Sequence, residues 1–127
     1  MIEQLADSLA SLLPLTIREA SYTEDIALML AGEGWAFSTV SAWRVIRDRV
    51  LAYGWSDARA ADLVWDLCGQ QIVSVTAQSQ TMRGDPAFGL STGERLEIFS
   101  DHPTDPWVFR LPGVTYVGSP SDRRYSA

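Results

Sequence analysis

The 127-residue chain contains no lysine and no asparagine, and it has one histidine and one cysteine. A single cysteine, Cys68, excludes an intrachain disulfide, and a buried small side chain is its default interpretation. No apolar run approaches the roughly 20 residues that a membrane-spanning helix requires. Residues 1–13 include Glu3 and Asp7 but no basic residue, whereas a signal peptide begins with a basic segment. We therefore expect a cytoplasmic protein that does not bind a membrane.

The charge is strongly unbalanced, with 16 acidic residues against 10 basic ones and a net charge of −6. Because an acidic surface repels phosphate backbones, we expect no direct binding to nucleic acid. All basic residues are arginine. A GC-rich genome explains this more simply than selection for planar guanidinium contacts does. The acidic surface is suited to a basic protein partner.

Motifs for nucleophilic catalysis or phosphate binding are missing. No Gly-x-Ser-x-Gly sequence is present, and Gly32-Glu33-Gly34 is followed by an alternating strand pattern instead of a helix. His102 lies in a loop-like segment where Asp101 and Asp105 could join it as metal ligands. An exposed turn with an incidental histidine is the simpler interpretation. We predict no catalytic residue, no cofactor and no metal.

An internal repeat is visible along the chain. Residues 12–17 and 67–72 each place Leu and Ile five positions apart around a turn residue, and Gly-Glu then precedes an alternating run in both halves. Trp43 lies 11 residues before Gly54, and Trp107 lies 11 residues before Gly118. We predict one domain over residues 1–127, with repeats at 1–57 and 58–122 and a loose tail at 119–127.

Each repeat has the pattern of a short helix followed by a β-meander. Apolar residues from Ile2 to Leu13 recur at helical spacing, and Asp57 is a natural N-cap for a second helix over 58–67. The remaining segments alternate like half-buried strands. The expected strands are 14–21, 25–31, 35–41, 43–47, 50–54, 71–79, 85–91, 95–100, 106–111 and 114–118. The fold class is therefore α+β and mostly antiparallel, with two tandem units packed about a pseudo-two-fold axis around one shared core.

Tryptophan and aspartate residues at equivalent positions have two interpretations each. Trp43 and Trp107 are expected in the core, whereas Trp55 has no counterpart and favours a binding surface. Asp25 and Asp85 could form a carboxylate pair, but aspartates at the ends of elements more simply accept backbone hydrogen bonds.

The second repeat contains an acidic segment in which four acids accompany only one basic residue, Arg95. Its acids are the candidate partner-binding residues, together with Trp55: Glu94, Glu97, Asp101 and Asp105. Because Glu97 alternates with Leu96 and Ile98, we expect its side chain to point into solvent. Asp101 and Asp105 flank a loop, where binding residues are common.

A resemblance to a known group of proteins covers mainly residues 66–122. Leu67-x-Gly69-x-x-Ile72, Gly84-Asp85, the run Ile98-Phe99-Ser100-Asp101 and Trp107 resemble a group of small uncharacterised bacterial proteins. Some proteins of this kind resemble immunity proteins of bacterial toxin systems. The resemblance implies a β-rich fold and supplies no catalytic residue.

We expect a non-catalytic, acidic, protein-binding protein, most plausibly an immunity or inhibitor protein that neutralises a partner such as a bacterial toxin. A homodimer is compatible with this role. One alternative is a small-molecule binding module that uses a Trp-lined cleft between the two units. The other is a metal-assisted enzyme centred on Asp101, His102 and Asp105.

Overall fold

The computed structural model describes residues 2–24, 27–102 and 104–118. Within these residues the chain forms two α-helices, one short 3₁₀-helix and eleven strands. In chain order they are α1 (Ile2–Leu9), β1 (Leu15–Thr16), β2 (Glu19–Thr23), β3 (Ala27–Gly32), β4 (Trp35–Thr39), β5 (Ala42–Arg47), β6 (Val50–Gly54), α2 (Ala60–Val64), η1 (Trp65–Leu67), β7 (Gln71–Ala77), β8 (Pro86–Leu90), β9 (Arg95–Phe99), β10 (Trp107–Leu111) and β11 (Val114–Val117). The expected α+β class with antiparallel strands is confirmed.

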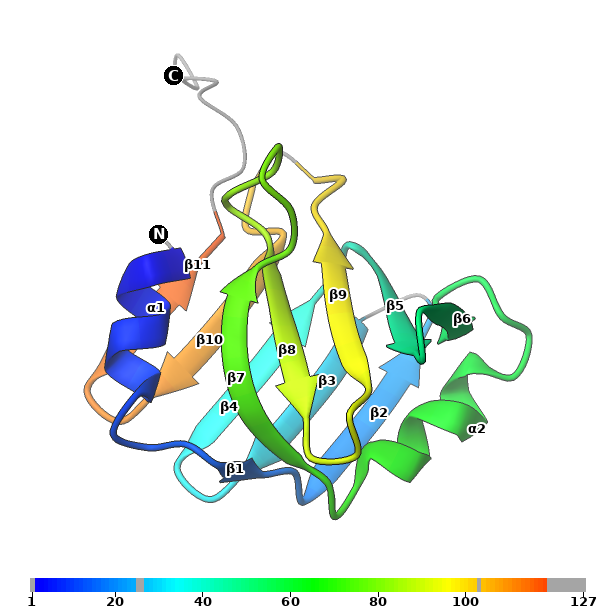
Figure 1. Cartoon of the computed structure of the whole chain (residues 1–127), viewed down its shortest axis with the longest axis horizontal. Coiled ribbons are helices and arrows are strands. Elements are labelled where there is room, and N and C mark those ends of the chain that lie inside the picture. The colour runs from blue at the N-terminus through cyan, green and yellow to red at the C-terminus, as the bar shows by residue number, and fades with distance from the viewer. Residues whose placement is uncertain (1, 25–26, 103, 119–127) are drawn as a thin grey trace.

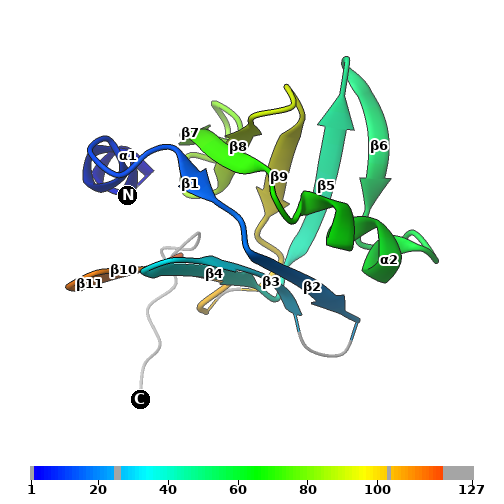
Figure 2. The ribbon, with the colours of Figure 1, turned by 90° about the horizontal axis from the view of Figure 1, so that it is seen from below.

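The strands form two sheets packed face to face, and Figure 2 shows them as two layers. Sheet A has the order β1-β7-β8-β9-β5-β6, and sheet B has the order β11-β10-β4-β3-β2. Neighbouring strands in both sheets pair antiparallel. The helices lie at opposite ends of the layers, where α1 contacts β7 and α2 contacts β2 and β6 (Figures 1 and 2).

Each sheet combines strands from both halves of the chain. In sheet A the run β7-β8-β9 continues into β5-β6, and in sheet B the run β2-β3-β4 continues into β10-β11. Apart from β1, which has no counterpart in sheet B, replacing β2 to β6 by β7 to β11 in order, and the reverse, converts the strand order of one sheet into that of the other. The two halves therefore cannot unfold independently, because each completes the other's sheet.

The chain crosses from one sheet to the other between β1 and β2. The Ile17 amide donates to the Gln70 carbonyl at 2.8 Å on the sheet A side. The Arg18 amide donates to the Ala31 carbonyl, also at 2.8 Å, on the sheet B side. The single strand expected over 14–21 is therefore wrong, because neighbouring residues bond to different sheets. An alternating apolar pattern cannot distinguish one strand from two short strands in sequence.

Both helices are shorter than expected. α1 ends at Leu9, and the amides of Leu12 and Leu13 close a turn on the Leu9 carbonyl. Pro14 then disfavours a helical backbone at Leu13. Asp57 lies before α2, where its carboxylate accepts a hydrogen bond from the Arg59 amide at 2.8 Å. Neither α1 nor α2 has the length and apolar run needed to cross a bilayer, considering only the described part of the chain.

One hydrophobic core lies between the sheets and includes residues from both predicted repeats. Trp43 on β5 and Trp107 on β10 are 1% and 0% exposed, so their expected burial is confirmed. Phe37, Phe88 and Phe109 pack in contact with one another at the centre. Buried residues of α1 close one end of this core, and residues of α2 and η1 close the other.

Candidate functional site

Glu97 lies in an ion-pair cluster on the outer face of sheet A. In the β5–β9 register it stands opposite Arg44, whose Nε donates to Glu97 Oε1 at 2.7 Å. Arg95 Nε donates to the other carboxylate oxygen, Oε2, at 2.9 Å. Glu97 does lie on the opposite face from Leu96 and Ile98, but the two guanidinium groups leave it only 8% exposed. The expectation that its side chain points into solvent is therefore wrong.

Glu94 is also enclosed, at the end of the β8–β9 hairpin. Its Oε2 accepts hydrogen bonds from Arg47 Nη2 at 2.6 Å and Nε at 3.1 Å, and its Oε1 is near Gln70 and Thr92. The residue is 6% exposed. A carboxylate already neutralised by a paired guanidinium contributes little to a partner surface. Alternation along β9 could not show this, because Arg47 and Gln70 are far away in the sequence.

These two carboxylates predict how stability depends on pH. Burial alone would raise the pKa of Glu97, but hydrogen bonds and positive charge from Arg95 and Arg44 outweigh it, so the pKa lies below its ordinary value. The pKa of Glu94 is also lowered, because hydrogen bonds from Arg47, Thr92 and Gln70 outweigh burial. A lowered folded-state pKa gives stability that is fully present above the unfolded value and lost as pH falls through the folded value.

We therefore expect the free energy of unfolding to fall as pH drops below the ordinary glutamate value of 4.5. The E94Q/E97Q variant should be less stable at neutral pH and should lose less further stability on acidification. Urea unfolding at a series of pH values measures both. If acidification lowers the free energy of unfolding of E94Q/E97Q as much as that of the unmodified chain, Glu94 and Glu97 are not the cause of the pH dependence.

Asp101 and Asp105 remain open to solvent in the loop before β10. The Asp101 side chain is 58% exposed, and its Oδ1 lies 3.7 Å from His102 Nε2. Asp105 is exposed and has a left-handed backbone, with φ of +47°. No group of three His, Cys, Asp or Glu side chains placed to hold a metal is found in residues 2–24, 27–102 and 104–118. The absence of a metal therefore stays a prediction.

Trp55 projects from the end of β6 and is 49% exposed. Its amide donates to the Trp43 carbonyl at 3.1 Å, and its own carbonyl accepts from the Tyr22 hydroxyl, also at 3.1 Å. Tyr22 in turn packs edge-on against Trp43, with ring centroids 5.1 Å apart. The backbone of Trp55 is thus fixed to two core aromatics while its indole stays accessible.

Trp55 lines two small hollows of about 130 and 220 Å³. Tyr22 and Glu24 also line both of them. Asp101 completes the charged lining of the first hollow, and Asp57 completes that of the second. Among the described residues that line these hollows, every charged side chain is therefore acidic. We name Tyr22, Glu24, Trp55, Asp57 and Asp101 the Trp55 surface.

The Trp55 surface includes two of the five predicted partner-binding residues, Trp55 and Asp101. Tyr22, Glu24 and Asp57 were not predicted. Tyr22 and Glu24 come to lie beside Trp55, about 30 positions away in the sequence, through packing between the two sheets and not through strand pairing. Burial and the nearby Glu24 carboxylate raise the pKa of Tyr22 above its ordinary value. The tyrosine therefore stays a neutral hydrogen-bond donor beside these acids.

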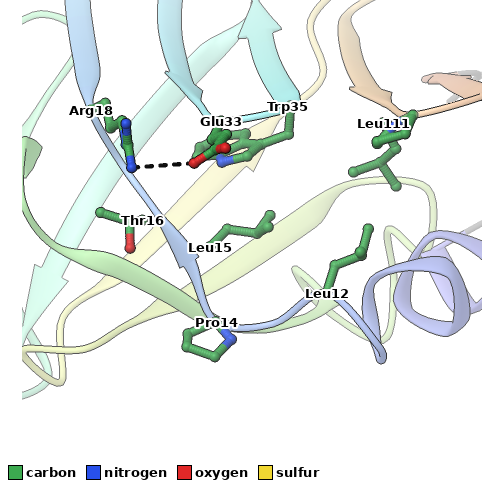
Figure 3. Close-up of a pocket in the computed structure, with 10 residues that line it drawn as sticks. Leu12, Pro14, Leu15, Thr16, Arg18, Glu33, Trp35 and Leu111 are labelled. Carbon is green, nitrogen blue, oxygen red and sulfur yellow. Dashed lines mark hydrogen bonds and ion pairs between the residues drawn. The ribbon is translucent and has the colours of Figure 1, made fainter.

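A larger pocket of about 390 Å³ lies at the opposite end of β4, where the two predicted units meet (Figure 3). Leu12 and Leu111 border its apolar side, and Trp35 forms part of its wall. Arg18 and Glu33 form an exposed ion pair at its rim, with Nη2 and Oε2 3.3 Å apart. The pocket is lined by residues of both predicted repeats and contains one tryptophan, so the expected Trp-lined cleft between units stays a prediction.

Asp85 is 1% exposed, and its carboxylate accepts hydrogen bonds from the Ser100 hydroxyl and from the Ser100 amide, the latter at 2.8 Å. It therefore joins the segment before β8 to the end of β9. This geometry agrees with the interpretation that such aspartates accept hydrogen bonds at the ends of elements. Asp25, the proposed second member of a carboxylate pair, lies outside the described residues.

Comparison of the chain with protein-family models, curated proteins and solved structures gave no match. A functional assignment therefore depends on the chemistry of these sites.

Proposed function

We propose that this chain is a non-catalytic protein that binds a basic segment of a protein partner through the Trp55 surface. The main supporting observation is the position of Trp55, a half-exposed indole that lines two hollows whose charged residues are all acidic. A guanidinium or ammonium group over an indole gains cation–π attraction, and adjacent carboxylates can accept its hydrogen bonds.

The distribution of charge supports the same partner chemistry. The chain has a net charge of −6, while Glu94 and Glu97 are already paired with arginines. The acids of the Trp55 surface, by contrast, form no ion pair with a guanidinium group of the described residues. Long-range attraction would speed encounter with a basic partner, and salt would screen it.

Within this class we infer an immunity or inhibitor role acting in the cytoplasm. The support is the sequence resemblance of residues 66–122 together with an acidic, aromatic binding surface. A toxin-like gene beside this one, with a product that the chain binds, is the test. Failure of the chain to bind or protect against that product would contradict the role.

The second candidate function is small-molecule binding in the pocket of Figure 3. Its size of about 390 Å³ is within the range of ligand pockets, and it combines an apolar wall with a charged rim. The Trp55 surface is preferred for a protein partner because its hollows are small and its charge has one sign.

We also infer that the two halves are copies of one unit related by a pseudo-two-fold axis. The exchange of strand order between the sheets supports this, as do the equivalent positions of Trp43 and Trp107. The Gly118 amide donates to the Trp107 carbonyl, as the Trp55 amide does to the Trp43 carbonyl. By this hydrogen bond, Trp55 is the structural counterpart of Gly118. The repeat in the sequence instead aligns Gly54 with Gly118, which differs by one residue. Superposition of β2–β6 on β7–β11 by a rotation far from a half-turn would contradict a two-fold relation.

The Trp55 surface predicts a specific effect of W55A on binding to a basic probe, a short peptide of alternating glycine and arginine. W55A should weaken binding about tenfold, which corresponds to about 1.4 kcal/mol. W65A is the matched control, because Trp65 is 68% exposed but lines neither hollow. Isothermal titration at low salt measures both affinities.

Further variants separate charge from shape. E24Q/D101N should weaken binding and reduce its dependence on salt, and a peptide with glutamate in place of arginine should not bind. Equal affinity of the unmodified chain and W55A for the arginine peptide would contradict the proposed function.

A further inference from the structure

The outer face of sheet B carries few charged side chains, although the chain as a whole is acidic. Alternation along its strands directs one set of side chains into the core and the other away from it. Sheet A, α1 and α2 all lie on the core side (Figure 2). The outward residues of its strands are Glu19, Ser21, Thr23, Ala27, Met29, Ala31, Ala36, Ser38, Val108, Arg110, Thr115 and Val117. Only Glu19 and Arg110 are charged.

The outer face of sheet A provides an internal comparison. There Arg44 and Arg95 enclose Glu97, and the Arg44 guanidinium lies 4.8 Å from the centre of the Phe99 ring. Around β5 and β9, sheet A is thus covered by its own charged side chains. Sheet B instead exposes short side chains around Met29, which is 49% exposed. No described helix or strand covers this nearly uncharged face, which makes it a surface suited to a partner.

The two charges of sheet B stand at opposite ends of one row across the sheet. The register pairs Glu19 with Ala31, Ala31 with Ala36, and Ala36 with Arg110. Three strand spacings separate the charges, about 14 Å in all. In the described part of the chain, neither Glu19 nor Arg110 forms an ion pair. The row is therefore negative at one end, neutral in the middle and positive at the other end.

From this complementarity we infer that a second copy of the chain docks on the outer face of sheet B, with a two-fold axis parallel to the strands and between β3 and β4. Such an axis reverses the row, so that Glu19 of each copy faces Arg110 of the other. An axis across the strands would not bring these opposite charges together. Aligned packing of two twisted sheets permits this arrangement.

The neighbouring row of outward side chains also fits against a second copy of itself that runs in the opposite direction. It contains Ser21, Met29, Ser38 and Val108 in order across the four strands. The same axis places Met29 of each copy over Ser38 of the other, so a long side chain meets a short one. The long thioether side chain can adapt to such a gap. Two independent rows thus select the same axis.

Charge reversal tests the axis directly by sedimentation velocity over a range of chain concentrations. The unmodified chain should form a dimer, and E19R and R110E should each raise its dissociation constant about tenfold or more, because the axis duplicates every like-charge contact. The double variant E19R/R110E should restore the dimer. An equimolar mixture of E19R and R110E should form a heterodimer, since both contacts then join opposite charges.

M29R tests the centre of the face and should abolish the dimer. V73R is the matched control, because Val73 is 44% exposed on β7 in the other sheet. Circular dichroism should show that both variants fold. A chain that stays monomeric at millimolar concentration would overturn the inference. So would a dimer that V73R disrupts, or one that neither E19R nor R110E weakens.

Discussion

Replacing Trp107 with alanine should lower the free energy of unfolding by about 3–5 kcal/mol, the usual cost of truncating a buried tryptophan. The residue is 0% exposed on β10, so neither solvent nor a surface loop can fill the cavity. Gly118 lies directly beside its indole, since a Cβ atom there would fall 2.5 Å from Trp107 Nε1. Trp43 is equally buried, and W43A should cost a similar amount. Urea unfolding measures both losses.

Phenylalanine variants separate packing from hydrogen bonding at these two positions. Trp107 Nε1 donates to the Gly84 carbonyl at 3.1 Å, whereas Trp43 Nε1 has no hydrogen-bond partner among the described residues. W107F should therefore cost about 1 kcal/mol more than W43F. A loss below about 1 kcal/mol for both alanine variants would contradict the assignment of these residues to the core.

The second large effect is expected at Gly32, at the end of β3. An added Cβ would lie well inside van der Waals contact of the Thr16 carbonyl oxygen and of Trp35 Nε1. The Thr16 backbone is held by β1 pairing with β7, so it cannot move away freely. G32A should lower the free energy of unfolding by about 3 kcal/mol, the upper end of ordinary overpacking costs.

G69A is the control for backbone strain without a clash. Gly69 has φ of +90°, and an added Cβ there would meet nothing within 4 Å. Its cost should be about 1–2 kcal/mol, from the left-handed backbone alone. If G32A is no more destabilising than G69A, the close approach of β1 to Gly32 is not a structural constraint.

Local patterns in the sequence predicted most of the strands. The segment 50–54 matches β6, and alternation of apolar residues located β4, β8 and β9 to within a few residues. The buried Trp43 and Trp107 followed from their flanking apolar positions. These features depend on which face of a strand is covered, and neighbouring residues determine that.

Contacts between distant segments could not be predicted in this way. The sequence indicated the outward direction of Glu97, but Arg44, which covers it, is 53 positions away. The crossing at Ile17 depends on hydrogen bonds to Gln70 and Ala31, in two different sheets. Tyr22 and Glu24 likewise reach Trp55 only through tertiary packing. The sequence therefore predicted only part of the candidate site. It indicated Trp55, which has no tryptophan counterpart in the other repeat, and Asp101, which flanks a loop.

Nuclear magnetic resonance of the indole N–H groups tests the proposed binding surface most directly. The chain has five tryptophans, so each indole signal can be followed, and the spectrum of W55F identifies the Trp55 signal. Addition of the glycine–arginine peptide should shift that signal and the amides of Glu24 and Asp101, while the buried Trp43 and Trp107 indoles stay in place. An unmoved Trp55 signal, with shifts confined to Trp35 and its pocket, would contradict the proposal.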